Sequence, residues 1–154
     1  MTLPTTAYDT AIFDSIPNSG TELGFTLLVD LANMSETFDT NWDDSDGTKG
    51  RAARHSNGEE FATDWIDVDD TAKTGTLRIF VPGAMSAGFT VRVYPPNSAN
   101  SSYAASDPYG SENAYDEHTE MYLPLVEDPS GSAPQAIDRT SNNNDGTSAG
   151  TMLT

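Results

Sequence analysis

The sequence predicts an all-β protein, an antiparallel β-sandwich of the jelly-roll type with long polar loops. The strongest signal lies in residues 75–95, where two apolar–polar alternations are separated by Pro82-Gly83. Strict alternation in a run rich in β-branched and aromatic residues is typical of strands, and proline and glycine end such runs. Abundant Asp, Asn, Ser, Thr and Gly favour many short strands joined by polar loops. The two strands within 75–95 are expected to be neighbours in one sheet.

Two further strands are expected earlier in the chain. Residues 7–16 form a short one that ends at the turn 17–20, and residues 23–31 form a stronger one. Alternate residues of the second strand share one face: Phe25, Leu27, Val29 and Leu31. Leu28 on the opposite face predicts that this strand is buried on both sides.

Between these regions the sequence predicts a loop followed by a hairpin. Residues 32–48 have no strand pattern, although Ser35 can cap a single helical turn after it. A weak strand at 50–55 and a stronger one at 60–68 flank Asn57-Gly58. This pair favours the positive φ angles of a tight hairpin turn.

Composition divides the chain into three parts. Residues 1–96 are assigned to the core of the β-sandwich. Residues 97–126 are assigned to a polar loop and one further strand, at 119–126, which complete the domain. Residues 127–154 are polar, with few hydrophobic side chains, and form a C-terminal extension.

The formal net charge of −17, from 24 acidic and seven basic residues, limits the partners that the protein can bind. A surface with this much negative charge repels phosphate backbones and anionic lipid. Nucleic acid is therefore not an expected partner. Acidic surfaces stay soluble at high ionic strength, which fits a marine or halophilic source as well as an ordinary acidic protein. No run approaches the roughly 20 apolar residues that a membrane span needs.

The chain lacks two sequence features, cysteine and a signal-peptide pattern, which limits the possible chemistry and the expected route in the cell. The chain has no cysteine, which excludes disulfides, thiolate nucleophiles and cysteine-based zinc sites. The first residues, MTLPTTAYDTAIF, lack the basic and continuous apolar regions of a signal peptide. A virion protein assembled inside a host cell would need no such signal.

Several segments, in order, resemble the family known as domain of unknown function 2341. The segments are FTLLVDLANM (25–34), NGEEF (57–61), TGTLRIFVP (74–82) and FTVRVYPPNSANSSY (89–103). The continuation over 114–150, with EDPSG and IDRTSNNNDGT, resembles the opening of the laminin-G-like or concanavalin-like lectin region that commonly follows this family.

The resemblance has departures and implications. RAARHSNG at 51–58 and MYLPLV at 121–126 differ from the usual pattern of the family. The resemblance implies an all-β module of surface, adhesive and phage-encoded proteins, without an established activity. It also makes residues 127–154 either a polar extension or the start of a truncated lectin-like region.

The acidic residues Asp43, Asp44 and Asp46 are a candidate calcium loop. Counted from Asp39, however, the position that an EF-hand reserves for glycine is Asp44, and the twelfth position is Gly50 instead of glutamate. The EF-hand interpretation therefore fails. A solvated acidic turn is favoured over a looser calcium loop, and no metal or cofactor is expected.

Catalytic signals are weak. His55 and His118 are the only histidines, and no G-x-S-x-G elbow is present. With 24 carboxylates a catalytic pair can be drawn anywhere, so no pair is informative. Glycoside hydrolysis, which needs two carboxylates about 5–9.5 Å apart, is the least implausible enzyme alternative.

Aromatic residues and two arginines are the candidates for binding. A face that stacks on sugar rings needs flat aromatic side chains with a polar edge, and the candidates for it are Trp42, Trp65, Tyr94, Tyr103, Tyr109 and Tyr115. The alternative for Trp65 and Tyr94 is a place in the core or in cross-strand pairs. Arg78 and Arg92 are predicted to face away from the apolar side of their strands, toward a carboxylate cluster or a docking partner.

These observations favour a non-enzymatic structural or interaction protein at the surface of a virion. It would be a capsid decoration, a turret, or a tail or fibre protein of a phage or archaeal virus, with further copies of itself or other virion proteins as partners. The alternative is a carbohydrate-binding or adhesion module of an extracellular or cell-surface protein, with a host-surface glycan as ligand. The expected interaction residues are Arg78, Arg92, Trp42, Tyr103 and Tyr109.

Overall fold

The structure is a computed structural model in which the chain divides into two units, Met1–Asp116 and Glu117–Thr154. The residues that it describes are 8–13, 24–83, 89–128 and 130–147. No helical segment within these ranges has the length and hydrophobicity that a membrane crossing requires.

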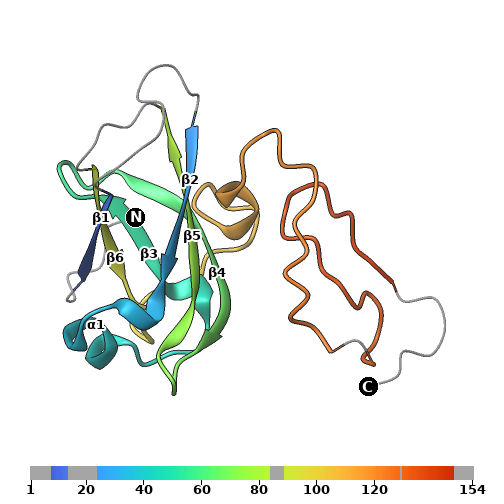
Figure 1. The fold of residues 1–154 in the computed structure, drawn as a ribbon, viewed down its shortest axis with the longest axis horizontal. Helices are drawn as coiled ribbons and strands as arrows, with labels where there is room; N and C mark the ends of the chain where they lie inside the picture. Colours follow the sequence, from blue (N-terminus) through green and yellow to red (C-terminus); the bar gives the residue numbers. More distant parts are fainter. Residues whose placement is uncertain (1–7, 14–23, 84–88, 129, 148–154) are drawn as a thin grey trace. The chain divides into compact units, whose positions relative to one another are not determined.

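The first unit contains one antiparallel sheet with the strand order β1-β6-β3-β4-β5-β2 (Figure 1). Its strands are β1 (Asp9–Phe13), β2 (Gly24–Asp30), β3 (Arg51–Arg54), β4 (Glu60–Asp69), β5 (Thr74–Pro82) and β6 (Phe89–Tyr94). The all-β prediction is confirmed, and every strand expected within residues 1–96 is present. The described residues form one curled sheet, so the two separate sheets of a sandwich are not seen among them.

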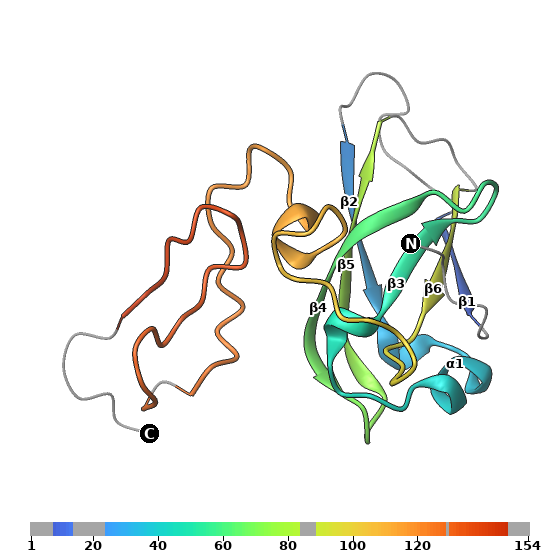
Figure 2. The ribbon, with the colours of Figure 1, turned by 180° about the vertical axis from the view of Figure 1, so that it is seen from behind.

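The sheet curls at β4. The start of β4 pairs with β3, where Phe61 lies opposite Ala52, and the remainder pairs with β5. A bulge interrupts the second pairing between Ile66 and Asp69, and bulges bend a strand and increase its twist. The halves β1-β6-β3 and β4-β5-β2 consequently face each other, as the view from behind shows (Figure 2).

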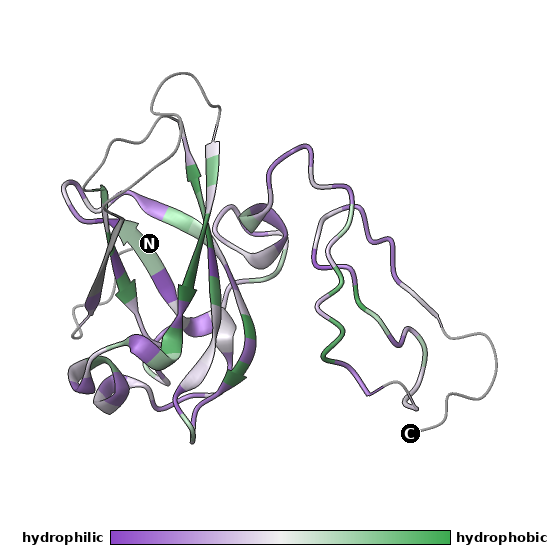
Figure 3. Ribbon diagram, in the orientation of Figure 1, coloured by the Kyte–Doolittle hydropathy of each residue, from purple (hydrophilic) through white to green (hydrophobic). Residues whose placement is uncertain are grey.

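The hydrophobic core lies between these two halves. The rings of Phe61 on β4 and Phe89 on β6 meet across it, with their centroids 6.1 Å apart. Figure 3 shows green, hydrophobic stretches along β5 and β6. The inward-facing positions of these strands are fully buried: Leu77, Ile79, Val81, Val91 and Val93. Alternation therefore predicted the buried face of both strands correctly.

Two predictions about these strands are wrong. β5 and β6 are not neighbours, because β3 and β4 lie between them in the sheet. Leu28 was expected to be buried but is 59% exposed, because it points away from the core on β2, an edge strand. Both errors concern partners that lie far away in the sequence.

The connection between β2 and β3 closes one end of the core. It contains η1 (Leu31–Asn33), α1 (Glu36–Asn41) and η2 (Gly47–Lys49). The predicted cap is present, because the Ser35 hydroxyl accepts a hydrogen bond from the Phe38 backbone N–H at 3.3 Å. Phe38 and Trp42 are buried against each other, with ring centroids 5.7 Å apart.

The segment 97–116, called here the covering segment, lies on the outer face of β4. It contains a short helical turn, η3 (Ser111–Ala114). Its Tyr109 carbonyl accepts a hydrogen bond from the backbone N–H of Thr63 on β4 at 3.2 Å. As a result β4 is buried on both faces.

The second unit is held by polar contacts. The strand predicted at 119–126 is not formed, and the backbone there is irregular. The physical reason is that the Tyr122 N–H donates to the side chain of Asp138, at 2.9 Å, instead of to a neighbouring strand. The described part of this unit has one isolated bridge, between Ala136 and Gly146.

Candidate functional site

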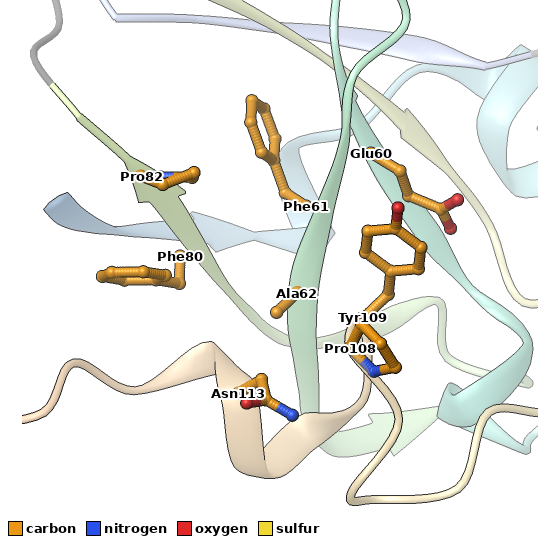
Figure 4. A pocket seen from close by; sticks show the side chains of 8 residues that line it. All are labelled: Glu60, Phe61, Ala62, Phe80, Pro82, Pro108, Tyr109 and Asn113. Carbon is orange, nitrogen blue, oxygen red and sulfur yellow. The ribbon is translucent and has the colours of Figure 1, made fainter.

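A hollow of about 260 Å³ opens on the outer face of β4 and β5. Figure 4 shows Phe80 and Pro82 of β5 on one side, Pro108 and Tyr109 of the covering segment on the other, and Ala62 of β4 between them. The remaining lining residues are Glu60, Phe61 and Asn113. The hollow exists because a small side chain lies between four larger ones.

The strand register explains why these residues meet. Residues 77, 79 and 81 of β5 point into the core, so Phe80 and Pro82 point outward. Ala62 lies opposite Phe80 in the pairing of β4 with β5, and space remains above its small side chain because the Phe80 ring lies over Gly24 of β2. The outward-pointing residues of β4 and β5 therefore form the floor of the hollow and one of its walls.

The other wall is fixed by contacts of Tyr115. Its hydroxyl lies 2.5 Å from a carboxylate oxygen of Asp64, a buried residue on the outer side of β4. The guanidinium of Arg78 on β5 lies 4.7 Å from the centroid of the Tyr115 ring. These contacts hold the covering segment against the sheet, and they thereby position Tyr109.

A second cluster fixes Tyr109 at the rim and Glu60 behind it. The buried guanidinium of Arg51 lies 3.8 Å from the Tyr103 ring, and its Nε lies 3.5 Å from a carboxylate oxygen of Glu60. The Tyr103 hydroxyl donates to the same oxygen at 2.8 Å. Burial, together with this bond to Glu60, raises the pKa of Tyr103 to about 12. The Tyr109 ring packs on Tyr103 with the centroids 5.8 Å apart.

The arrangement offers stacking surfaces beside polar groups. Tyr109 is 36% exposed, and its ring faces the same opening as the partly buried Phe80. Asn113 supplies an amide to the lining, whereas the Glu60 side chain is 8% exposed and its carboxylate is held by Arg51 and Tyr103 behind the Tyr109 ring. A small ring-shaped ligand with both an apolar face and hydroxyl groups would match this combination.

The structure brings some predicted site residues together and separates others. Tyr103 and Tyr109 are in contact, but only Tyr109 lines the hollow, because Tyr103 is buried behind it. Trp42, in contrast, is buried in the core with its indole N–H donating to the Asp44 carbonyl at 3.0 Å, so it belongs to no exposed sugar-stacking face. Trp65 and Tyr94 are buried too, in agreement with their core alternative.

Arg78 and Arg92 do not form one surface. Both face away from the core as predicted, but β3 and β4 separate their strands. Arg78 packs under the covering segment, whereas Arg92 lies beside Tyr8 and His55. Apart from Tyr109, sequence reasoning did not identify the residues that line the hollow: Glu60, Phe61, Ala62, Phe80, Pro82, Pro108 and Asn113. The alternation of side chains along β5 could have shown that Phe80 and Pro82 point outward, away from the core.

The acidic stretch remains partly exposed, and its carboxylates also form internal contacts. Asp44 pairs with Lys49 at 2.5 Å, and the hydrogen bond from Lys49 lowers the pKa of Asp44 below its ordinary value. Asp43 accepts from the backbone N–H of Ser98 at 2.7 Å, and Asp46 caps η2. Among the described residues, no group of three or more His, Asp or Glu side chains is placed to hold a metal ion.

No protein-family model matches this chain, and neither a curated protein nor a solved structure is significantly similar to it. The resemblance to domain of unknown function 2341, and to a lectin-like continuation, therefore stays a prediction.

Proposed function

We propose that the chain is a non-enzymatic interaction protein that serves as a structural component on the surface of a particle such as a virion. The observation that carries this proposal is the exposure of large apolar side chains in the second unit: Met121, Leu125, Val126 and Ile137. Leu125 alone is 69% exposed. Single exposed apolar side chains are common on protein surfaces, but four large ones in so short and polar a unit favour a docking role.

The backbone that carries these side chains has a defined shape. The buried carboxylate of Asp138 accepts hydrogen bonds from the backbone N–H groups of Tyr122, Thr140 and Asn144, at 2.8 to 3.0 Å. A segment that is already ordered loses less conformational entropy when it binds. The mechanism is passive: the sheet is displayed, and the second unit docks on a neighbouring subunit.

The proposal is tested by measuring the oligomeric state with light scattering over a range of protein concentrations. We expect the wild-type chain to assemble, and Leu125→Asp to shift the assembly midpoint by about tenfold or more in concentration. Leu28→Asp, at a similarly exposed apolar residue of the first unit, is the matched control. A wild-type chain that stays monomeric, or an equal effect of both variants, would contradict docking through the second unit.

The hollow favours a second candidate function, carbohydrate binding in an extracellular or cell-surface setting. The apolar face of a sugar ring would stack on Tyr109 while a hydroxyl group bonds to the amide of Asn113. Such a site uses one aromatic platform and a few polar groups, which is the usual composition of a small-ligand pocket.

A glycan array followed by titration calorimetry tests this candidate. Tyr109→Ala is expected to weaken the binding of a neutral glycan by roughly fivefold, because stacking on an aromatic ring is worth on the order of 1 kcal/mol. Tyr109→Phe keeps the ring and should keep most of the affinity. If no neutral glycan binds, or if Tyr109→Ala binds as well as the wild type, the hollow is not a sugar site.

A further inference from the structure

A cluster of three side chains, called here the Arg92 patch, is used by neither proposed function. One side chain comes from the outer face of β6, one from the residue before β1 and one from the residue after β3. The patch consists of Tyr8, His55 and Arg92. The Arg92 Nε donates to Nδ1 of His55 at 3.3 Å, and the guanidinium lies 4.9 Å from the centroid of the Tyr8 ring. The rings of Tyr8 and His55 meet edge to face at 6.4 Å.

The patch has a fixed base. The backbone N–H of His55 donates to the Thr90 carbonyl of β6 at 3.0 Å, and the Tyr8 ring rests on the buried Tyr94 with the centroids 5.3 Å apart. His55 is exposed, and Tyr8 is 38% exposed. The three side chains therefore present a preformed surface to solvent.

Arg92 differs from other cations of this acidic chain in its partners. Lys49, Arg51 and Arg54 each form an ion pair with a carboxylate. Within the described residues, Arg92 contacts an imidazole and a phenol ring but no carboxylate. Its Nε donates to His55, and this contact does not use the two Nη groups. These groups are the part of the guanidinium that can hold a carboxylate through two hydrogen bonds.

The neighbours of Arg92 also present hydrogen-bond donors. Because Nδ1 of neutral His55 accepts the bond from Arg92, the ring proton lies on Nε2, which becomes a donor. Tyr8 adds a hydroxyl group and the exposed part of its ring. A surface made of donors beside an arginine is complementary to an anion.

We propose that the Arg92 patch binds the carboxylate of an acidic sugar ring, of the hexuronic acid class. The carboxylate would accept from the Nη groups of Arg92 and from Nε2 of His55, while the sugar ring lies along Tyr8. A hexuronic acid carries its carboxylate directly on a ring, so one rigid group can meet both the arginine and the tyrosine. The net charge of −17 opposes the approach of any anion, but an acidic protein segment carries its carboxylates on flexible side chains and has no ring to lie along Tyr8. The repulsion of a single carboxylate is screened beyond about 8 Å at 0.15 M salt.

The proposal extends the sugar-binding candidate to a second site, and it can fail without affecting the hollow. The probe is a short oligomer of galacturonic acid, titrated by calorimetry into the full chain at about 0.15 M salt. We expect binding that is lost when the methyl ester of the same oligomer replaces the acid, because esterification removes the charge and keeps the ring.

Variants locate the site. Arg92→Gln should weaken binding by about tenfold or more, and Arg92→Lys should weaken it less, because lysine keeps the charge without the planar fork. Arg54→Gln is the matched control, since it removes the same charge from an arginine that Glu59 already pairs. Thermal melting confirms that each variant is folded.

Four results would overturn the proposal. They are the absence of binding at millimolar oligomer, equal losses in Arg92→Gln and Arg54→Gln, equally tight binding of a hexaglutamate peptide, and loss of binding in Tyr109→Ala. The last result would move the acidic sugar to the hollow. It would support the sugar-binding candidate while contradicting the patch.

Discussion

Arg51 shows how single residues decide this structure. Its guanidinium is buried, and a buried charge is tolerated only when it is paired and hydrogen-bonded. Its Nη1 donates to the carbonyls of Thr48 and Gly50 at 2.8 and 2.6 Å, its Nη2 donates to the Ser101 carbonyl, and Glu60 supplies the opposite charge. One side chain thus connects η2, the covering segment and β4.

We predict that Tyr103 ionises only near pH 12, whereas exposed tyrosines ionise near about 10. Its neutral hydroxyl donates to Glu60, so the bond stabilises the fold fully below pH ~10. That stability is lost as the pH rises from ~10 through the folded pKa of about 12, because the unfolded chain ionises first. Phenolate absorbance of the wild type and of Tyr103→Phe isolates this titration. If Tyr103 titrates with the exposed tyrosines, the bond to Glu60 is absent in solution.

At the level of elements, the sequence predicts each strand better than it predicts the pairing of strands. Alternation is a local property, so the buried face of β5 and β6 could be read directly. It contains no information about the neighbour, and β5 and β6 are therefore easily paired with each other. The Ser35 cap was predictable because its partner Phe38 lies only three residues away.

The site was less predictable for the same reason. Tyr103 and Tyr109 were recognised as aromatic candidates, but their neighbours Phe80 and Ala62 come from strands that precede them in sequence. The long-range bonds that fix the covering segment, such as Tyr115 to Asp64, have no signature in either partner's local sequence. The same holds for Asp138, whose contact with Tyr122 replaces the strand expected at 119–126.

We predict that Gly50→Ala destabilises the first unit through packing alone. A Cβ at Gly50 would overlap the indole of Trp65, whereas the backbone φ of −75° suits alanine. Overpacking of this kind costs roughly 1–3 kcal/mol in the free energy of unfolding, measurable by urea denaturation. In Trp65→Phe the smaller ring leaves room, so adding Gly50→Ala to that variant should cost less than in the wild type. Equal costs in both backgrounds would show that the steric explanation is wrong.

Across the whole molecule, the two units are stabilised by different forces. The first unit has a hydrophobic core that is shared by both halves of the curled sheet. In the described part of the second unit, the large apolar residues Met121, Leu125, Val126 and Ile137 are exposed, and a carboxylate occupies the centre. Acid should therefore act differently on the two units.

We predict that acid loosens the second unit first, through Asp138. Burial alone would raise the pKa of Asp138, but the N–H groups of Tyr122, Thr140 and Asn144 outweigh it and lower the pKa below its ordinary value. The carboxylate thus stabilises the unit above pH ~4, and this stability is lost as the pH falls through the lowered pKa.

The amide resonances of Tyr122 and Asn144 report this titration directly, since both N–H groups bond to the Asp138 carboxylate. Asp138→Asn should shift both amides at neutral pH and destabilise the unit by roughly 1–3 kcal/mol, because a charged acceptor is lost from a buried position. The matched control is Asp128→Asn, an exposed aspartate whose carboxylate bonds to Ser130 in its own turn, and it should leave these amides unchanged. If acid shifted the core amides of β5 at the same pH, or if both variants behaved alike, Asp138 would not be the group that orders the second unit.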